Sequence, residues 1–362
     1  MLTYRVSMVP GPTSVPTEVL AAYQVDYGSA DLENEFCELY VRTEAQLQRI
    51  LQTRNSCAIM TGEGMLALWA ALKSSLRPGD KVLALATGLF GFGIGDMARS
   101  LGAEVETVGF PWDGIFDPGP VEEAIKRFRP KMVTAVHCET PSGTLNPVGA
   151  VGGLVAQYDV PLFYVDAVSS AAGAELRLDD WHIDLGLVGT QKCLSAPPDM
   201  SIVTVSPRAW DVVKAVGYQG YDALQPWQTA LAEREFPYTP CWHCTAALAK
   251  ACELILAEGL ENVFARHGRA AAACRRGLRE LGLDLYPTRD EYCSPTVTAV
   301  KVPEAIGWVE LDRRLRRRGV AVGGNYGPLA GKVFRLGHMG TQASEVLVGQ
   351  VLAALREALA GE

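Results

Sequence analysis

The sequence predicts an α/β protein with a large domain built on a mostly parallel sheet of seven strands, followed by a smaller α+β domain. Three observations support this. Between about residues 56 and 205, short apolar segments alternate with helical ones. The apolar segments are continuous, which is typical of parallel strands buried on both faces of a sheet. After about residue 240 the order of elements changes, which indicates a second domain.

The strands of the large domain are short and strongly apolar. They span residues 56–60, 81–86, 104–108, 132–138, 162–168, 185–190 and 202–205. Helical segments lie between them at residues 65–75, 91–101, 121–128 and 151–158. In open sheets of this kind, ligands bind beyond the carboxyl ends of the strands. Polar residues at those ends are therefore the candidates for a functional site.

The second domain combines helices with a few strands. Its helices fall at residues 246–258, 260–281, 309–318 and 344–359, and its strands at 296–302, 320–323 and 333–336. The change of character near residue 240 places the large domain at residues 19–240 and the small domain at residues 241–362.

Composition and charge narrow the classes of function. The 362 residues are 48% hydrophobic and 20% charged, as in ordinary globular proteins, and the formal net charge is -8. A nucleic-acid surface needs a concentrated basic patch. The one basic run, residues 313–318, lies in a helical pattern. We interpret it as a solvated helix face, with a partner or anion site as the alternative.

Cysteine usage and hydropathy favour a cytoplasmic protein. The nine cysteines show no disulfide framework, and several lie in apolar runs. Cys241 and Cys244 have the CxxC spacing, but no second pair stands at the distance of a zinc ribbon. We therefore expect no metal and no redox role there. The sequence shows neither a signal-peptide pattern nor a membrane-spanning stretch, so we expect no membrane or nucleic-acid partner.

One lysine and one aspartate stand at the ends of two predicted strands. Lys192 follows the strand at 185–190 and is expected to project into a cleft, and Asp166 lies near the end of the strand at 162–168. A buried carboxylate there needs a cationic or hydrogen-bonding partner. Pyridoxal chemistry meets both conditions, because a lysine amine forms a Schiff base with the aldehyde and a carboxylate keeps the pyridine nitrogen protonated. Lys192 and Asp166 are therefore the predicted catalytic pair of a pyridoxal site.

Several stretches of the chain carry a resemblance to a known family. They are Pro10-Gly11-Pro12, the run HCETPSGTLNP from His137 to Pro147, the Asp166 strand, the Lys192 loop, and Arg335-Leu336-Gly337-His338-Met339-Gly340. Together they resemble the class V aminotransferases, which are fold-type I pyridoxal-dependent enzymes, and the likeness covers essentially the whole chain. The family includes alanine–glyoxylate, serine–pyruvate and pyridoxamine–pyruvate enzymes, and the last of these are the most similar around residues 137–147, 164–173 and 189–198.

The resemblance implies contacts around the cofactor ring and the substrate. Arg335 binds the substrate carboxylate, because a planar guanidinium donates two parallel bonds to it. Phe90 stacks on the ring and Val168 presses on its other face. The alternatives are a structural ion pair for Arg335 and ordinary core packing for the other two.

The resemblance also assigns residues at the edge of the pocket. The hydroxyl groups of Thr140 and Ser142 meet the cofactor or the substrate. The N-terminal segment, residues 1–18, borders the substrate pocket through the turn that contains Gly11. Tyr326 stands where the pyridoxamine–pyruvate enzymes carry a second arginine, nine residues before Arg335, so the contacts to the oxo acid or the substrate itself differ here.

The cup that holds the cofactor phosphate in this family is altered. Ordinary members bind phosphate with backbone N–H groups and hydroxyls at a helix start. Against that pattern, Glu63 replaces a serine, Met65 a histidine and Phe236 a tyrosine from the neighbouring subunit. Two unit charges about 4 Å apart repel by roughly 4 kcal/mol at an effective dielectric constant of about 20. The residues expected to line the cup are Glu63, Gly64, Met65 and Gln191, joined by Phe236 and Thr239.

Two functions follow from the two interpretations of Glu63. In the first, the enzyme moves an amino group from unphosphorylated pyridoxamine to pyruvate, giving pyridoxal and alanine, and Glu63 accepts a hydrogen bond from the hydroxymethyl group. In the alternative, Glu63 is only a helix N-terminal acid, and the enzyme is an alanine–glyoxylate or serine–pyruvate aminotransferase with bound pyridoxal 5′-phosphate.

Other classes fit less well. A vitamer sensor without activity is disfavoured because Lys192, Asp166 and Arg335 are retained. A cysteine desulfurase is disfavoured because Gln191 and Phe90 stand where those enzymes have histidines. The family resemblance implies a homodimer or homotetramer that takes a small amino donor and a 2-oxo acid.

Overall fold

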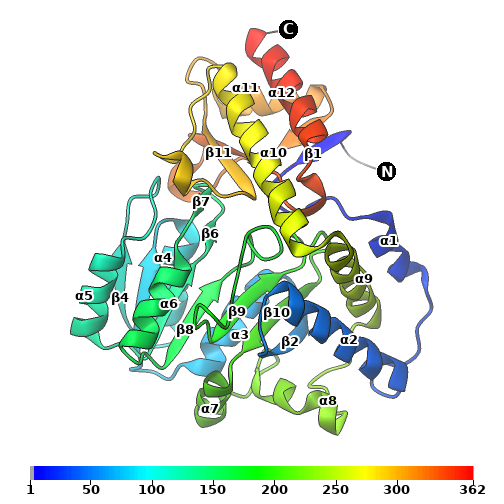
Figure 1. The fold of residues 1–362 in the computed structure, drawn as a ribbon, viewed down its shortest axis with the longest axis vertical. Coiled ribbons are helices and arrows are strands. Elements are labelled where there is room, and N and C mark those ends of the chain that lie inside the picture. The colour runs from blue at the N-terminus through cyan, green and yellow to red at the C-terminus, as the bar shows by residue number, and fades with distance from the viewer. Residues whose placement is uncertain (1–3, 362) are drawn as a thin grey trace.

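A seven-stranded sheet organises the larger part of the protein in the computed structural model, which describes residues 4–361 (Figure 1). Its order is β2-β10-β9-β8-β5-β3-β4, and only β10 runs antiparallel to its neighbours. The strands are β2 (Ser56–Thr61), β3 (Lys81–Ala86), β4 (Glu104–Gly109), β5 (Met132–Val136), β8 (Leu162–Asp166), β9 (Leu185–Gly189) and β10 (Met200–Val205). The prediction of a mostly parallel sheet of seven strands is confirmed.

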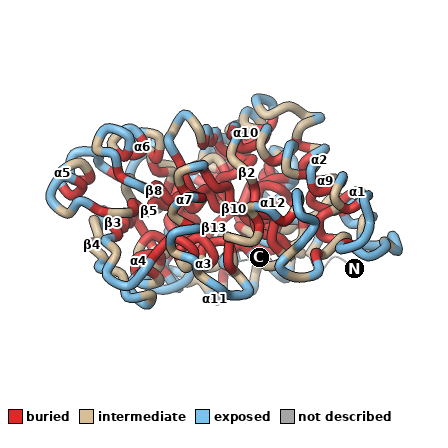
Figure 2. The backbone as a smooth tube through the Cα atoms, turned by 90° about the horizontal axis from the view of Figure 1, so that it is seen from below, coloured by how far each residue is buried: buried red, intermediate tan, exposed pale blue. Residues whose placement is uncertain are grey.

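Helices cover both faces of this sheet, as right-handed crossovers between parallel strands require. One face carries α3 (Gly64–Ser75), α4 (Leu89–Ser100) and α7 (Pro207–Val216), and the other carries α5 (Pro118–Phe128) and α6 (Val148–Gln157). Every residue of β5, β8 and β9 is buried, which explains their uninterrupted apolar sequence. Figure 2 shows the buried strands at the centre and the exposed outer sides of the helices.

One long helix was not predicted. α2 (Asn34–Ile50) packs against β2 and against α9 (Trp242–Glu258). Its buried side chains, among them Phe36, Tyr40 and Leu47, recur with the period of a helix. Buried side chains of α9 join the same core as the sheet. The domain limit at residue 240, directly before α9, stays a prediction.

The start of α9 corrects one expectation. Cys241 is the residue that caps the helix, and the structure joins its sulfur to Cys244 in a disulfide. The expectation of no disulfide was wrong here because the first helical turn brings the two Cα atoms to 5.3 Å, a separation that suits the bond. The helix also begins four residues before the predicted start.

A second, smaller core surrounds two pairs of strands. β1 (Val6–Met8) runs parallel to β12 (Val320–Val322), and β11 (Val297–Lys301) is antiparallel to β13 (Val333–Gly337). A single bridge between Gly323 and Arg335 connects the pairs. Against them pack α10 (Leu260–Glu280), α11 (Trp308–Arg317) and α12 (Glu345–Ala360). The N-terminal strand thus belongs with the last third of the chain, as Figure 1 shows.

Short elements complete the described chain. β6 (Cys138–Glu139) and β7 (Thr144–Leu145) form a hairpin directly after β5, which explains why β5 ends earlier than the predicted strand. The remaining elements are α1 (Thr17–Leu20), α8 (Ala230–Glu233), and the 3₁₀ helices η1 (Ala21–Gln24), η2 (Gln225–Gln228), η3 (Asp290–Tyr292), η4 (Gly327–Leu329) and η5 (Gly340–Gln342).

The basic run of α11 is largely neutralised by its own surroundings. Arg313 and Arg314 pair with Glu310, and Arg316 pairs with Asp312. This agrees with the interpretation as a solvated helix face. Within residues 4–361, none of the helices combines the length and the apolar character needed to cross a bilayer.

Candidate active site

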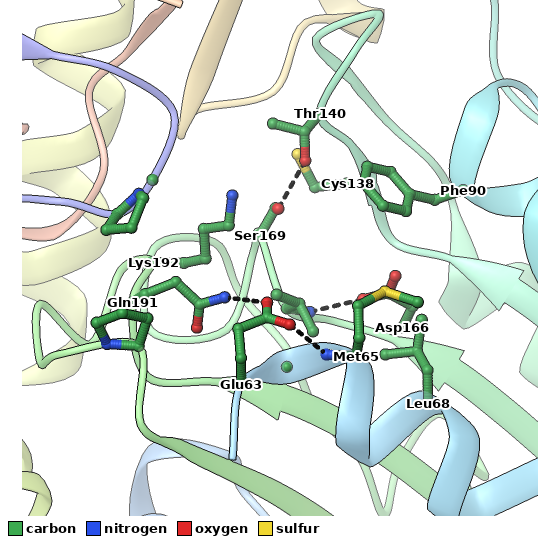
Figure 3. A pocket seen from close by; sticks show the side chains of 15 residues that line it. Glu63, Met65, Leu68, Phe90, Cys138, Thr140, Asp166, Ser169, Gln191 and Lys192 are labelled. Carbon is green, nitrogen blue, oxygen red and sulfur yellow. Dashed lines mark hydrogen bonds between the residues drawn. The ribbon is translucent and has the colours of Figure 1, made fainter. Parts of the chain in front are cut away.

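A cavity of about 300 Å³ opens at the carboxyl ends of the parallel strands (Figure 3). Asp166 is the last residue of β8, and Lys192 follows the neighbouring strand β9 by three residues. Because both strands run in the same direction, their ends bring the two side chains to one cavity. Most residues singled out from the sequence line it: Gly11, Glu63, Gly64, Met65, Phe90, Thr140, Asp166, Val168, Gln191 and Lys192.

The amino group of Lys192 is held by the N-terminal segment. Its Nζ donates a hydrogen bond of 2.5 Å to the carbonyl oxygen of Pro10. A Cβ atom at Gly11 would lie 2.7 Å from Nζ, so a larger residue there would displace the amine from this position. Burial, reinforced by the positive charge of Arg335, lowers the pKa of Lys192. A lowered pKa increases the fraction of neutral amine, which is the nucleophilic form.

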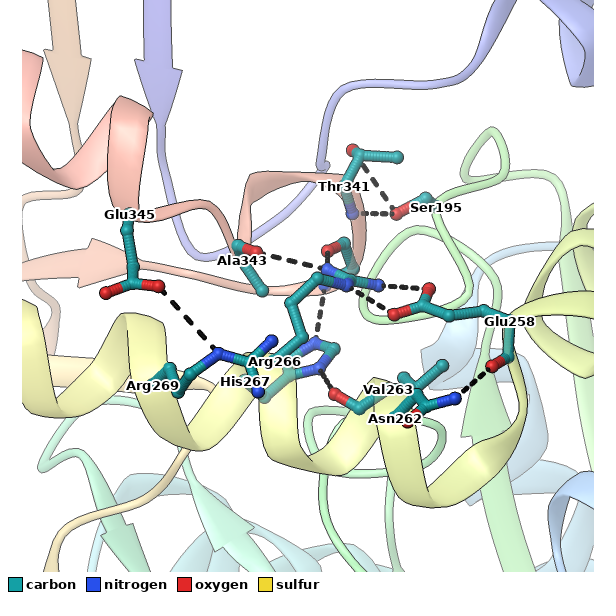
Figure 4. Close-up of polar contacts among 11 residues, drawn as sticks. Ser195, Glu258, Asn262, Val263, Arg266, His267, Arg269, Thr341, Ala343 and Glu345 are labelled. Atoms are coloured by element: carbon teal, nitrogen blue, oxygen red, sulfur yellow. Dashed lines mark hydrogen bonds and ion pairs between the residues drawn. The ribbon is translucent and has the colours of Figure 1, made fainter.

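Residues that follow later in the chain stabilise the loop that carries Lys192 (Figure 4). Ser195 accepts a 2.9 Å hydrogen bond from the backbone N–H of Thr341. Arg266 on α10 donates to the carbonyl oxygen of Gly340 and forms an ion pair with Glu258 at the end of α9. The lysine loop is therefore supported by α9, α10 and the turn between β13 and α12.

Asp166 is a buried carboxyl group at the end of β8. Its Oδ1 accepts a hydrogen bond of 2.9 Å from the backbone N–H of Val168. Burial raises the pKa of Asp166 to about 6, against the opposing effects of this bond and of Lys192. No ion pair to Asp166 occurs within residues 4–361. A ligand that brings a protonated ring nitrogen to this carboxylate supplies the missing charge.

Phe90 is positioned by an acid that the sequence analysis did not single out. Glu139 accepts hydrogen bonds from the backbone N–H groups of Phe90 and Gly91, at 2.9 and 3.1 Å, in the first turn of α4. Burial raises the pKa of Glu139 to about 7. Its place shortly after the buried apolar strand β5 was the available signal, because an acid at the end of such a strand needs hydrogen-bond donors.

Hydroxyl and thiol groups line the wall beside Lys192. Thr140 shares a 2.6 Å hydrogen bond with Ser169, and both line the cavity. Cys138 lies in the same wall and bonds to Ser294 at 3.2 Å. Ser169 and Cys138 were not predicted as site residues. Ser169 stands three residues after Asp166, so the strand-end position that identified Asp166 also applies to it.

The N-terminus of α3 lies at the other end of the cavity, and a side chain of the protein accepts one of its backbone N–H groups. Glu63 caps α3, and its Oε2 accepts the backbone N–H of Met65 at 2.9 Å. Its Oε1 accepts from Nε2 of Gln191 at 2.5 Å. The Oε1 atom of Gln191 is buried and has no hydrogen-bond partner within the described chain. This end of the cavity thus presents the carboxylate of Glu63, while its backbone donor at Met65 is already used.

A second cavity, of about 490 Å³, adjoins the first and shares Gly11, Phe90, Thr140 and Lys192 with it. Arg335 on β13 lies in its wall and is 4% exposed. Its guanidinium donates twice to the carbonyl oxygen of Gly324, at 2.8 and 2.6 Å, and lies 4.9 Å from the ring centre of Tyr326. No carboxylate pairs with it within residues 4–361, so the structural ion pair considered above is absent.

Three residues singled out from the sequence lie outside both cavities. Ser142 is fully buried and donates to the carbonyl oxygen of Glu139. Phe236 packs against Phe36, and Thr239 donates to Asp31. A role for Phe236 and Thr239 in the site of a second subunit stays a prediction.

Together these groups fit a vitamin B6 ring. Lys192 lines both cavities, Asp166 lines the first, and Arg335 lines the second. An aldehyde matches the amine, a protonated ring nitrogen matches Asp166, and a substrate carboxylate matches Arg335.

Comparisons with known proteins agree with this geometry. A family model described as aminotransferase class-V matches residues 8–334. Pyridoxamine–pyruvate transaminase of Mesorhizobium japonicum is 34% identical over 362 residues, covering 98% of this chain and 91% of that protein. The crystal structure of pyridoxamine–pyruvate aminotransferase from Mesorhizobium loti has a TM-score of 0.95 at 33% identity, over 99% of this chain and 92% of that one. Ureidoglycine–glyoxylate aminotransferase from Bacillus subtilis has a TM-score of 0.94 at 33% identity, over 98% and 92%.

The fold, with its site at the carboxyl ends of parallel strands, is that of the fold-type I pyridoxal-phosphate-dependent transferases. Within that class, the chain belongs to the class-V aminotransferases, enzymes that transfer amino groups.

Proposed function

We propose that this enzyme moves an amino group between unphosphorylated pyridoxamine and pyruvate, giving pyridoxal and alanine. The observation that carries the proposal is the hydrogen bonding of Glu63. A carboxylate of the protein already occupies the helix start at which related folds receive an anion.

The hydrogen-bonding groups around Glu63 favour an unphosphorylated ring over a phosphorylated one. The carboxylate of Glu63 is a hydrogen-bond acceptor, and a hydroxymethyl group has a hydrogen to donate to it. A phosphate dianion has no such hydrogen and is repelled by Glu63. A repulsion of roughly 4 kcal/mol between single charges at about 4 Å is larger than the net stabilisation by one neutral hydrogen bond.

The proposed roles of the other residues follow from their places. The ring, when bound, supplies an electron sink for the amino-transfer chemistry. Asp166 binds the ring nitrogen and keeps it protonated, while Phe90 and Val168 hold the ring between them. The amine of Lys192 would bond to the aldehyde carbon of the bound pyridoxal, and when free it would move the proton between that carbon and the α-carbon of the amino acid. Arg335 binds the carboxylate of the oxo acid.

The named relatives support the class of reaction and leave two candidates for its substrates. Pyridoxamine–pyruvate transaminase supports the vitamer reaction. Ureidoglycine–glyoxylate and serine–glyoxylate relatives support the alternative, an aminotransferase with bound pyridoxal 5′-phosphate. The hydrogen bond from the N–H of Met65 to Glu63 also fits the alternative, because it is the contact that an ordinary helix cap makes.

The decisive experiment uses dialysed protein with pyridoxamine and pyruvate and without any phosphate ester, and measures the pyridoxal and alanine formed. We expect turnover, with kcat/KM for pyridoxamine at least about 100-fold above that for pyridoxamine 5′-phosphate, since about 4 kcal/mol corresponds to nearly three orders of magnitude. A purified protein that retains pyridoxal 5′-phosphate through dialysis and does not turn over pyridoxamine contradicts the proposal.

A single substitution tests Glu63 directly. Glu63→Ser removes the carboxylate and frees the N–H of Met65, so we expect at least about tenfold tighter binding of pyridoxal 5′-phosphate and a loss of pyridoxamine turnover. The matched control is Asp117→Ser. Asp117 also caps a helix by accepting a backbone N–H, but it lies at the exposed start of α5. Equal effects of the two substitutions would show that only helix capping matters.

The assembly belongs to the proposal as well. We propose a cytoplasmic homodimer or homotetramer. Large apolar side chains that are exposed on the single chain, namely Leu20, Val25, Leu32 and Val41, support a covering subunit over the region from α1 to α2.

A further inference from the structure

Two cysteines enclose the first turn of α9 and differ from all others in the described chain. Cys241 and Cys244 are joined in a disulfide, while the remaining seven cysteines are free. Cys241 is partly exposed, whereas Cys244 is 7% exposed. Cys241 is therefore the more exposed residue of the pair, and Cys244 the shielded one.

The position of Cys241 favours a stable thiolate after reduction. It is the N-cap of a 17-residue helix, and its sulfur accepts the backbone N–H of Cys244 at 3.3 Å. A helix N-terminus stabilises a negative charge, and cysteines placed there in CxxC motifs are more acidic than free cysteine. Within residues 4–361, no third His, Cys, Asp or Glu completes a metal site with the pair. The chemistry left to these two sulfurs is thiol–disulfide exchange.

We propose that Cys241 and Cys244 form a reversible thiol–disulfide exchange site whose reaction partner is a dithiol. A thiolate of the dithiol attacks the sulfur of Cys241, the bond to Cys244 breaks, and Cys244 leaves as a thiolate that takes a proton. In the resulting mixed disulfide, one sulfur belongs to the dithiol and the other to Cys241. The second thiol of the dithiol then attacks the dithiol's sulfur, and Cys241 leaves as a thiolate. Two electrons pass to the protein, and the dithiol leaves as a disulfide.

The surroundings connect this pair to the support of the active site. Tyr27 stacks on Trp242, which lies between the two cysteines, with ring centres 5.3 Å apart. One turn later, Ala247 and Ala251 pack against Ala196 in the lysine loop. The far end of α9 carries Glu258, the ion-pair partner of Arg266 (Figure 4). The cross-link thus fixes the first turn of a helix on which the lysine loop rests.

The test is a redox titration of the intact enzyme. The native protein is equilibrated with mixtures of reduced and oxidised dithiothreitol, quenched with acid, alkylated and digested with trypsin. Cleavage after Arg234 and Lys250 yields one peptide, residues 235–250, that contains both cysteines. We expect this peptide to change from unalkylated to doubly alkylated in one two-electron step, while the peptides of the other cysteines do not respond. A peptide that is fully alkylated at every ratio, or never alkylated without denaturant, overturns the proposal.

Single substitutions test which sulfur is attacked first. In Cys244→Ser only Cys241 remains, and in Cys241→Ser only Cys244 remains. We expect iodoacetamide to label Cys241 at least about tenfold faster than Cys244 in the native proteins, because Cys241 is the less buried of the two and lies at the helix N-terminus. Equal labelling rates overturn the assignment of Cys241 as the entry point. The titration of the unsubstituted enzyme needs neither variant, so it stands even where a substitution impairs folding.

Discussion

At the scale of single residues, the strongest sequence signals were charged side chains placed where apolar strands end. Lys192 and Asp166 were selected on that ground, and both line one cavity. Arg335, selected through the family resemblance, lies in the wall of the adjoining cavity. Glu139 was missed because its role depends on backbone N–H groups of α4, almost 50 residues earlier in the chain.

The proposed role of Arg335 gives a prediction at this scale. Arg335→Lys removes the two-pronged donor and leaves the carbonyl group of Gly324 without its two bonds. We expect KM for pyruvate to rise about 10- to 100-fold, since a lost pair of charge-assisted bonds costs about 1.5–3 kcal/mol. KM for pyridoxamine should stay unchanged.

Steady-state kinetics with each substrate varied in turn measure both constants. Arg313→Lys, on the surface of α11 beside Glu310, is the control and should alter neither constant. An equal rise of both KM values in Arg335→Lys contradicts a carboxylate-specific role.

At the scale of elements, the sheet and most helices of the large region follow from apolar periodicity. The spacing of Phe36, Leu39, Tyr40, Thr43 and Leu47 also carries the helical period, so the omission of α2 is an error of interpretation. The early start of α9 differs in kind, because cysteine is a weak signal for a helix cap. Capping of α4 by Glu139 depends on a hairpin that lies far along the chain.

The buried carboxyl of Glu139 predicts a pH dependence of stability. Its pKa in the folded protein is about 7, above the ordinary value of 4.5. Between these values the folded state keeps a proton that the unfolded state has lost, so the contribution of Glu139 to stability is full below pH 4.5 and falls as the pH rises through 7. Relative to Glu139→Gln, the unliganded enzyme should lose on the order of 2 kcal/mol of unfolding free energy between pH 5 and 8.

Urea unfolding of the unliganded protein at several pH values measures this difference. Glu104→Gln, at the exposed start of β4, is the control and should leave the pH profile of the parent unchanged. Parallel profiles for the parent and Glu139→Gln contradict the prediction. The pKa of Asp166 is also raised, to about 6. Because Asp166 is present in both proteins, its contribution to the pH dependence largely cancels in the comparison.

At the scale of the whole molecule, the chain folds back on itself. β1, at the start of the chain, pairs with β12, and the segment that follows brings the carbonyl group of Pro10 to Lys192. The two cavities meet between the two cores, so the site requires both parts of the chain.

The proposed assembly is tested at this scale. Leu32 is 78% exposed on the single chain, so Leu32→Asp should leave the fold intact but weaken a subunit interface over this region. We expect sedimentation equilibrium to show an increase of at least about tenfold in the dissociation constant of the dimer. Val309→Asp is the control, because Val309 is 81% exposed but lies on α11. A parent protein that sediments as a monomer refutes the assembly.

The order of residues along the chain was enough to predict the sheet, the covering helices α3, α4, α5 and α6, and the placement of Lys192 and Asp166, because strand period, apolar runs and strand ends are local properties of the chain. The covering helix α7 was not predicted. The packed fold was needed to see that Glu63 both caps α3 and accepts a hydrogen bond from Gln191, that Glu139 binds the backbone N–H of Phe90, and that Cys241 and Cys244 meet at a helix start. The physical reason is that these contacts join residues through space, and their partners are fixed only when separate strands and helices pack at one edge of the sheet.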